Sequence, residues 1–116
     1  MSDNFGLKIG VEGEREFKTA LKDINANFKV LGSEMNLVTS MFDRNDKSVQ
    51  ALTARNSVLN KEIDAQKDKV ALLREALSNA SESFGEGDRR TQAWATQLNN
   101  AQAGLNTLER ELDNNN

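Results

Sequence analysis

Residues 17–42 read FKTALKDINANFKVLGSEMNLVTSMF. In this stretch the apolar residues recur at alternating steps of four and three, which is the spacing of the heptad repeat. Spacing of this kind places the apolar side chains on one face of a helix, and that face must be buried against another helix. The sequence therefore predicts a helix over about residues 13–42. The residues that share the spacing are Phe17, Leu21, Ile24, Phe28, Leu31, Met35, Val38 and Phe42.

The same spacing occurs in two later stretches, and we call each of the three apolar rows a seam. The second and third seams predict helices over about residues 46–83 and 88–113. The second seam consists of Val49, Leu52, Asn56, Leu59, Ile63, Gln66, Val70, Leu73, Leu77, Ala80 and Phe84. The third seam consists of Thr91, Trp94, Leu98, Ala101, Leu105, Leu108 and Leu112.

Two short polar segments separate the seams. Residues 43–46 (DRND) are either a tight turn or a kink in one longer helix, and the Asn and Asp side chains favour the turn. Residues 84–88 (FGEGD) form the clearer turn, because Gly85 can adopt the left-handed conformation that ends a helix. Asp88 can then cap the following helix. The second and third helices are therefore expected to form an antiparallel hairpin.

The chain before the first seam has a different pattern. Leu7, Ile9 and Val11 alternate with glycine and lysine, and this period of two is typical of a strand. Gly13 then interrupts the pattern. The sequence thus predicts a short, extended, β-like segment at residues 1–12, whose pairing partner is undefined.

The composition agrees with a helical fold. Only 37% of the residues are hydrophobic, 28% are charged and proline is absent. A narrow seam needs fewer apolar residues than a globular core does, and no proline interrupts a helix. We predict an all-α fold, a long antiparallel helical hairpin or coiled coil of about three helices, with a helical coiled-coil domain at residues 13–116. The seams can be buried within one chain, as a three-helix bundle, or between chains; the second solution, a homo-oligomer, is favoured.

The absence of cysteine and histidine excludes disulfides, thiolate nucleophiles, Ser-His-Asp triads and most zinc sites. Carboxylates two residues apart on a helix, such as Glu109 and Glu111, point to different faces and do not converge. We therefore expect no enzymatic activity, no cofactor and no metal site. The net charge of −3 without a basic cluster argues against nucleic-acid binding, and no apolar run is long enough to span a membrane.

Asn56 and Gln66 are polar residues at seam positions. Such a residue either fixes the alignment of the packed helices, at a cost in stability, or lies at a solvated part of the seam. Both are therefore candidate register residues. Trp94 is expected to contribute to packing rather than to a binding site.

Six stretches carry a family resemblance: GLKIGVEGEREF (6–17), LKDIN (21–25), KVLGSEM (29–35), LTARN (52–56), FG (84–85) and RRTQ (89–92). They resemble the N-terminal region of the tail tape measure proteins of phages and prophages of Gram-positive hosts. The similarity extends over about residues 5–112, without any catalytic motif.

The resemblance implies a structural role in virion assembly. Tape measure proteins are long helical proteins that lie inside the tail tube and set its length, and tail tube proteins and tail assembly chaperones are their partners. The expected location is the interior of the virion tail, after synthesis in the host cytoplasm. Family members are much longer than 116 residues, so the chain is expected to be the N-terminal part of a longer protein or a prophage remnant.

A second function class stays open. The same pattern suits a helical-hairpin interaction module, either a small secreted hairpin protein or a regulatory coiled coil. The turn at residues 84–87 lacks the Trp-x-Gly sequence that marks the type VII secreted hairpin proteins, which lowers the weight of the secreted alternative.

Overall fold

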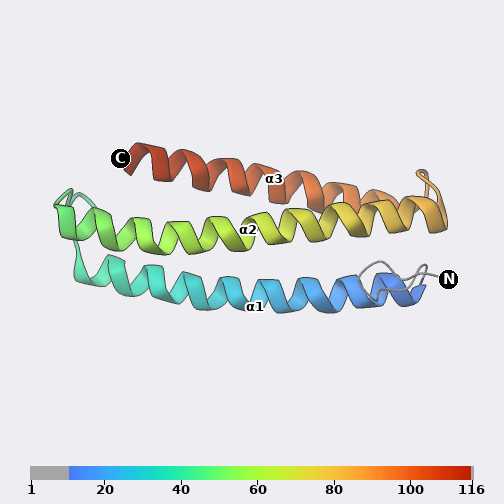
Figure 1. The fold of residues 1–116 in the computed structure, drawn as a ribbon, viewed down its shortest axis with the longest axis horizontal. Coiled ribbons are helices and arrows are strands. Elements are labelled where there is room, and N and C mark those ends of the chain that lie inside the picture. Colours follow the sequence, from blue (N-terminus) through green and yellow to red (C-terminus); the bar gives the residue numbers. More distant parts are fainter. Residues whose placement is uncertain (1–10, 116) are drawn as a thin grey trace.

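The computed structural model describes residues 11–115, and this part of the chain is all-α, with three helices and no strand. Helix α1 spans Val11–Met41, α2 spans Val49–Phe84 and α3 spans Arg89–Asn115. The helices lie side by side and alternate in direction, which gives an elongated shape of 54 × 22 × 20 Å (Figure 1). The predicted all-α fold of three helices is therefore confirmed.

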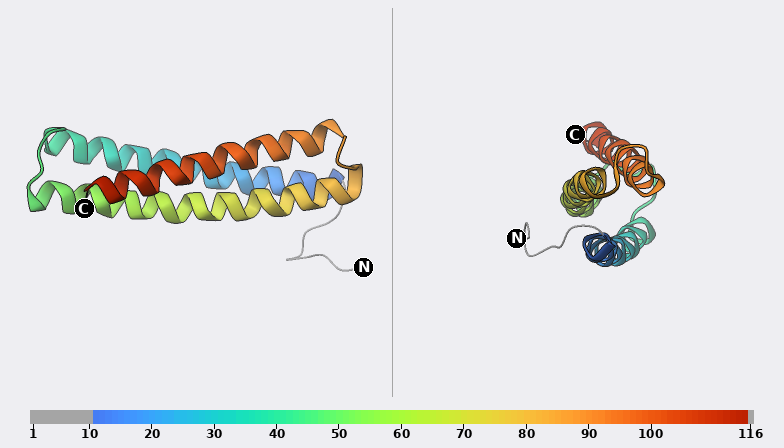
Figure 2. Two further views of the ribbon diagram at one scale, coloured as in Figure 1. Left: turned by 90° about the horizontal axis from the view of Figure 1, so that it is seen from above. Right: turned by 90° about the vertical axis from the view of Figure 1, so that its right-hand side faces the viewer.

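Helix α2 is the central element. It packs against both α1 and α3, whereas no Cα atom of α1 lies within 8 Å of a Cα atom of α3. Figure 2 shows this arrangement from above and from one end, with α1 and α3 on different sides of α2. The molecule is therefore two helix pairs that share one helix.

The start of α1 differs from the prediction. The sequence predicts an extended segment up to residue 12, but the helix already begins at Val11. Gly13 lies inside the first turn and is buried, so it does not interrupt the helix. Glu12 and Glu14 are in the same turn, where negative charge stabilises the free N–H groups of a helix start. The remaining part of the predicted β-like segment lies outside the described residues.

The first reversal of the chain occurs between α1 and α2 and is built from side-chain caps. The Asp46 carboxylate accepts a hydrogen bond from the Ser48 N–H at 2.8 Å, and the Ser48 hydroxyl accepts one from the Ala51 N–H at 3.2 Å. The bond from Ser48 lowers the pKa of Asp46. Arg55 donates to the carbonyl oxygens of Asp43 and Asp46. Because Ser48 is the N-cap, α2 begins at Val49, three residues later than predicted.

The second reversal depends on Gly85, which has φ +91° and ψ 156°. The positive φ agrees with the expected glycine conformation, although the extended ψ is not the left-handed helical value. Asp88 caps α3 by accepting a hydrogen bond from the Arg90 N–H at 2.8 Å. The Arg90 guanidinium also bonds Asp88, which lowers the pKa of that carboxyl group, and lies 3.5 Å from the centre of the Phe84 ring.

The core follows the length of α2. Leu59 and Leu73 are its most completely buried large side chains, at 1% and 0% exposure. One continuous cluster joins residues of all three helices, and its members are Phe17, Ile63, Val70, Leu73, Ala76, Ala80, Trp94, Ala101 and Leu105. Because the cluster includes only Phe17 from α1, most of its packing joins α2 to α3.

Candidate functional site

The features with the most specific geometry are the contacts that align the three helices. The predicted seam residues divide into three groups by burial, of which the exposed group is Val49 alone. The buried members are Phe17, Leu31, Leu59, Ile63, Gln66, Val70, Leu73, Ala80, Thr91, Trp94, Ala101 and Leu105. The half-buried members are Leu21, Ile24, Phe28, Met35, Val38, Phe42, Leu52, Asn56, Leu77, Phe84, Leu98, Leu108 and Leu112.

One end of the second seam lies in solvent. Val49, its first residue, is 79% exposed. It stands at the first position of α2, directly after the Ser48 cap. The expectation that Val49 starts the packed row is therefore wrong, and the buried part of α2 begins at Ala51, which is fully covered.

Trp94 is the point at which α3 reaches α1 through its side chain. Its ring meets the Phe17 ring edge to face, with centroids 6.5 Å apart and planes at 69°. Its indole Nε1–H donates to Glu14 Oε2 at 3.2 Å, and the other oxygen of Glu14 lies 3.7 Å from Lys18 Nζ. Trp94 is 2% exposed. This junction therefore holds α1 and α3 together at the end of the molecule that contains the α2–α3 turn.

Gln66 lies at the buried α2–α3 interface. Its Nε2 donates to the carbonyl oxygen of Ala101 at 2.7 Å, and its side chain is close to Gly104. A Cβ atom at position 104 would be 2.9 Å from Gln66 Nε2, so the glycine leaves the space that the amide occupies. The contact defines one axial position of α3 along α2. The other register candidate, Asn56, is half-buried and accepts a hydrogen bond from Asn115 Nδ2 at 3.2 Å.

Two glycines inside helices are expected to respond oppositely to alanine. At Gly32 a Cβ atom meets nothing within 4 Å, so Gly32→Ala should raise the free energy of unfolding by up to about 1 kcal/mol through helix propensity. Gly104→Ala should instead lower it by about 1 kcal/mol, because displacing Gln66 leaves a buried amide unsatisfied, and that cost exceeds the propensity gain. Urea unfolding followed by circular dichroism measures both.

A double substitution isolates the cause of the Gly104 effect. In a Gln66→Ala background the amide is absent, so Gly104→Ala should no longer destabilise the protein. Equal losses for Gly104→Ala with and without Gln66 would contradict the role assigned to this contact.

A second buried row on α2 escaped the sequence analysis. Ala51, Val58 and Ala65 follow one another at intervals of seven and are all buried. Lys61 and Lys69, four residues before and after Ala65 and therefore on its side of the helix, contact α1. Lys61 pairs with Glu34 at 3.1 Å and Lys69 donates to Asn25 at 3.0 Å. The seven-residue spacing was the available signal, although alanine is a weak mark of burial.

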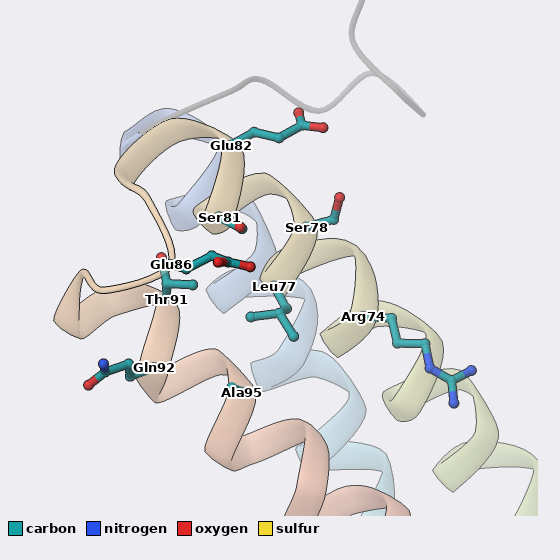
Figure 3. Close-up of a pocket in the computed structure, with 9 residues that line it drawn as sticks. All are labelled: Arg74, Leu77, Ser78, Ser81, Glu82, Glu86, Thr91, Gln92 and Ala95. Atoms are coloured by element: carbon teal, nitrogen blue, oxygen red, sulfur yellow. The ribbon is translucent and has the colours of Figure 1, made fainter.

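A shallow pocket of about 610 Å³ lies between α2 and α3 beside their turn. Figure 3 shows Glu86 directed into the space between the two helices, with Arg74 and Glu82 directed away from it. These charged groups do not converge on one point. The lining residues are Arg74, Leu77, Ser78, Ser81, Glu82, Glu86, Thr91, Gln92 and Ala95.

Two other kinds of site are absent from the part of the chain that the structure describes. Within residues 11–115, no cluster of three or more Asp, Glu, His or Cys side chains could hold a metal ion. Among the helices of that same part, none combines the length and apolar character needed to cross a membrane.

Glu62 is a half-buried acidic residue of α2 that lies near Glu111 of α3. Burial raises its pKa, and the negative charge of Glu111 on α3 raises it further. Since the pKa is higher in the folded state than in the unfolded state, folding favours the protonated form. The stability from this group is complete below the ordinary pKa of 4.5 and is lost as the pH rises through the raised value.

Glu62→Gln is therefore expected to stabilise the protein at pH 7, by on the order of 0.5 kcal/mol for a partly solvated charge pair. The gain should vanish near pH 3, where both the folded and unfolded carboxyl groups are protonated. Thermal unfolding at several pH values tests this, with Glu75→Gln, at an exposed position of the same helix, as the control. A gain of equal size at pH 3 and pH 7 would show that the charge is not responsible.

Comparison with known proteins gave no relative: no protein-family model, curated protein or solved structure matches this chain. A proposal for the function of this chain therefore draws on its own sequence, fold and contacts.

Proposed function

We propose that the chain is a structural segment of a phage tail tape measure protein, from the N-terminal region of that protein, and that it acts through helix–helix association and not as an enzyme. The proposal rests on the sequence phrases between residues 5 and 112 and on one structural observation, the elongated all-helical shape of 54 × 22 × 20 Å. A narrow helical rod suits the inside of a tube. Tail tube proteins and tail assembly chaperones are the proposed partners, and the tail interior is the proposed location.

The distribution of buried and exposed apolar side chains supports an assembly role. The seams of α2 and α3 are largely used inside the chain, through the cluster around Leu73 and Trp94. In the part of the chain that the structure describes, four large apolar side chains are exposed, all of them on α1 or at the start of α2: Val30, Leu37, Met41 and Val49. Exposed apolar side chains grouped on one part of a protein are typical of surfaces that meet other proteins. We propose coiled-coil packing with other chains at this part of the molecule.

The test uses the phage or prophage that encodes the chain. Removing residues 11–115 in frame should abolish normal tails, or change their length, in negatively stained virions. Ala103→Glu changes only an exposed position of α3 and should leave the tails unaltered, whereas Leu73→Asp should reproduce the deletion because it places a charge in the core. Virions of normal number and tail length from the deletion strain would refute the proposal.

The neighbouring genes separate this proposal from a general helical-hairpin interaction module. Genes for tail tube and tail assembly chaperone proteins upstream support the tape measure role. A gene for a regulator or a secretion apparatus in their place supports the interaction module, which the exposed apolar residues of α1 also suit.

A further inference from the structure

The heptad spacing of the three seams continues through both turns. Phe42 and Val49 are seven residues apart, with Asn45 at the seam position between them. Gly87 takes the corresponding position in the second turn, so steps of four and three alternate without a break over residues 17–112. The packing of three separate helices does not require the turns to preserve this count. If a turn became helical, the seams on its two sides would therefore lie on one face of a longer helix.

The first turn, residues 43–48, is the one that can become helical. It contains neither glycine nor proline, whereas the second turn contains two glycines, which disfavour a helix. The bend of the first turn depends on local bonds. Asp46 accepts from the Ser48 N–H, and the Ser48 hydroxyl accepts from the N–H of Ala51. Arg55 donates to two carbonyl oxygens of the turn. A continuous helix would replace these bonds with backbone hydrogen bonds of its own.

The packing of α1 on α2 has a symmetry that a second copy can use. Lys61 Nζ lies 3.1 Å from Glu34 Oε1. Lys69 Nζ donates to Asn25 Oδ1 at 3.0 Å, so residue i of α1 lies level with about residue 94 − i of α2. Two straight helices related by a two-fold axis at residue 47 have the same alignment. Seam residues then lie opposite seam residues, as in the pairs Leu21–Leu73, Ile24–Val70 and Leu31–Ile63.

We propose that the first turn is a hinge at which the chain exchanges α1 with a second copy of itself. When the turn becomes helical, residues 11–84 of each copy form one helix, and α1 of each copy packs on α2 of the other. The contacts between α1 and α2 are all kept, as is the junction of Phe17 with Trp94, but they now join two chains. The result is an isologous dimer, and exchange of an identical element is a low-cost route to it.

The two forms differ mainly at the hinge. Val49, which is 79% exposed in the folded-back chain, lies on the continuous seam beside the two-fold axis and becomes covered in the dimer. Against this gain, the bonds of Asp46, Ser48 and Arg55 within the turn are lost, and the axis brings the two Asp46 carboxylates closer together. The folded-back monomer is therefore the form at low concentration, and the dimer forms as the concentration rises. This inference does not depend on the proposed function.

Sedimentation velocity of the full chain over a wide concentration range tests the hinge. Ser48→Ala removes the N-cap of α2 from two monomers but nothing from the dimer that they form. It should therefore raise the association constant at least about tenfold over that of the wild type. Asp88→Ala removes the cap of α3 at the second turn and should leave the association constant unchanged. A Ser48→Ala chain that stays monomeric up to millimolar concentration overturns the proposal.

Crosslinking distinguishes exchange from association of intact bundles. Ordinary and isotopically heavy Ser48→Ala chains are unfolded in urea and refolded together, and a carbodiimide then joins Lys61 to Glu34. The dimer fraction should give crosslinked peptides that contain one light and one heavy partner, and the monomer fraction should give none. Lys18 and Glu14 belong to the same helix and should crosslink only within one chain in both fractions. Dimers whose Lys61–Glu34 crosslinks all lie within single chains overturn the proposal.

Insertions between Asn45 and Asp46 test the continuous seam in the same Ser48→Ala background. Two inserted alanines turn α1 by about 200° relative to α2 in a straight helix, so the dimer should be lost. Seven inserted alanines return both seams to one face, so the dimer should be retained. The folded-back monomer accommodates either insertion in its surface turn, and circular dichroism checks that both variants stay helical. Equal dimerisation of the two variants contradicts the role of the seam.

Discussion

Trp94→Ala is expected to lower the free energy of unfolding by about 3–5 kcal/mol, the range for removing a large buried aromatic side chain. Trp94 is 2% exposed, and its removal eliminates both the edge-to-face contact with Phe17 and the hydrogen bond to Glu14. These are the contacts that join α3 to α1. A change of this size is a large fraction of the total stability of an ordinary domain. Urea unfolding followed by circular dichroism at 222 nm measures it without relying on tryptophan fluorescence.

Trp94→Phe separates the two contributions. The phenyl ring retains most of the packing against Phe17 but has no donor for Glu14. The loss should therefore be smaller than for alanine, about 1–2 kcal/mol, which reflects the hydrogen bond and the smaller ring. If Trp94→Ala changed the stability by less than 1 kcal/mol, the junction would not hold α1 in place.

Leu73→Ala is expected to cost about 2–5 kcal/mol, the range for creating a cavity at a fully buried leucine. Leu73 has 0% exposure and lies in the second half of α2, in the cluster shared by the three helices. Because neighbouring helices cannot move together freely to fill the space, the upper half of this range is expected. The same urea experiment measures the loss.

Leu37→Ala is the matched control for Leu73→Ala. It removes the same atoms from a side chain that is 61% exposed, so its effect should stay within about 0.5 kcal/mol. Dilute protein is required, since Leu37 belongs to the exposed apolar surface that is proposed to pack against other chains. Similar losses for the two variants would mean that α2 is not the central packed helix.

The sequence predicted the helices because each seam carries a periodic signal and each turn carries residues with local chemistry. Gly85 and Asp88 act within a few residues of the chain, so their roles follow from residue type alone. The start of α2 was placed three residues early because Asp46 and Ser48 can both cap a helix. Only the successive bonds from Ser48 to Asp46 and from Ala51 to Ser48 show which of them is the N-cap.

The packing arrangement was harder to predict. A central helix buries two rows, but the second row on α2 relies on alanines such as Ala51 and Ala65, which are weak indicators of burial. The spacing placed Gln66 on a seam, yet its partner depends on the axial position of α3. That position is fixed by Gly104 and Ala101, which are 35 or more residues away in the chain. Long-range geometry of this kind leaves no local pattern in a sequence.

Because the chain folds back on itself twice, its length along the long axis is much shorter than that of one continuous helix with the same number of residues. A single continuous helix of the 105 residues from 11 to 115 would extend about 158 Å, at 1.5 Å per residue. The described part is only 54 Å long, so each residue advances the long axis by about 0.5 Å, since 54 divided by 105 is about 0.5. Deleting seven residues from one helix would misalign its packing against the neighbouring helices. The molecule would not simply become shorter by the length of those seven residues. In the proposed tape measure role this segment would add a fixed length, because only a helix that does not fold back converts residue number into distance at 1.5 Å per residue.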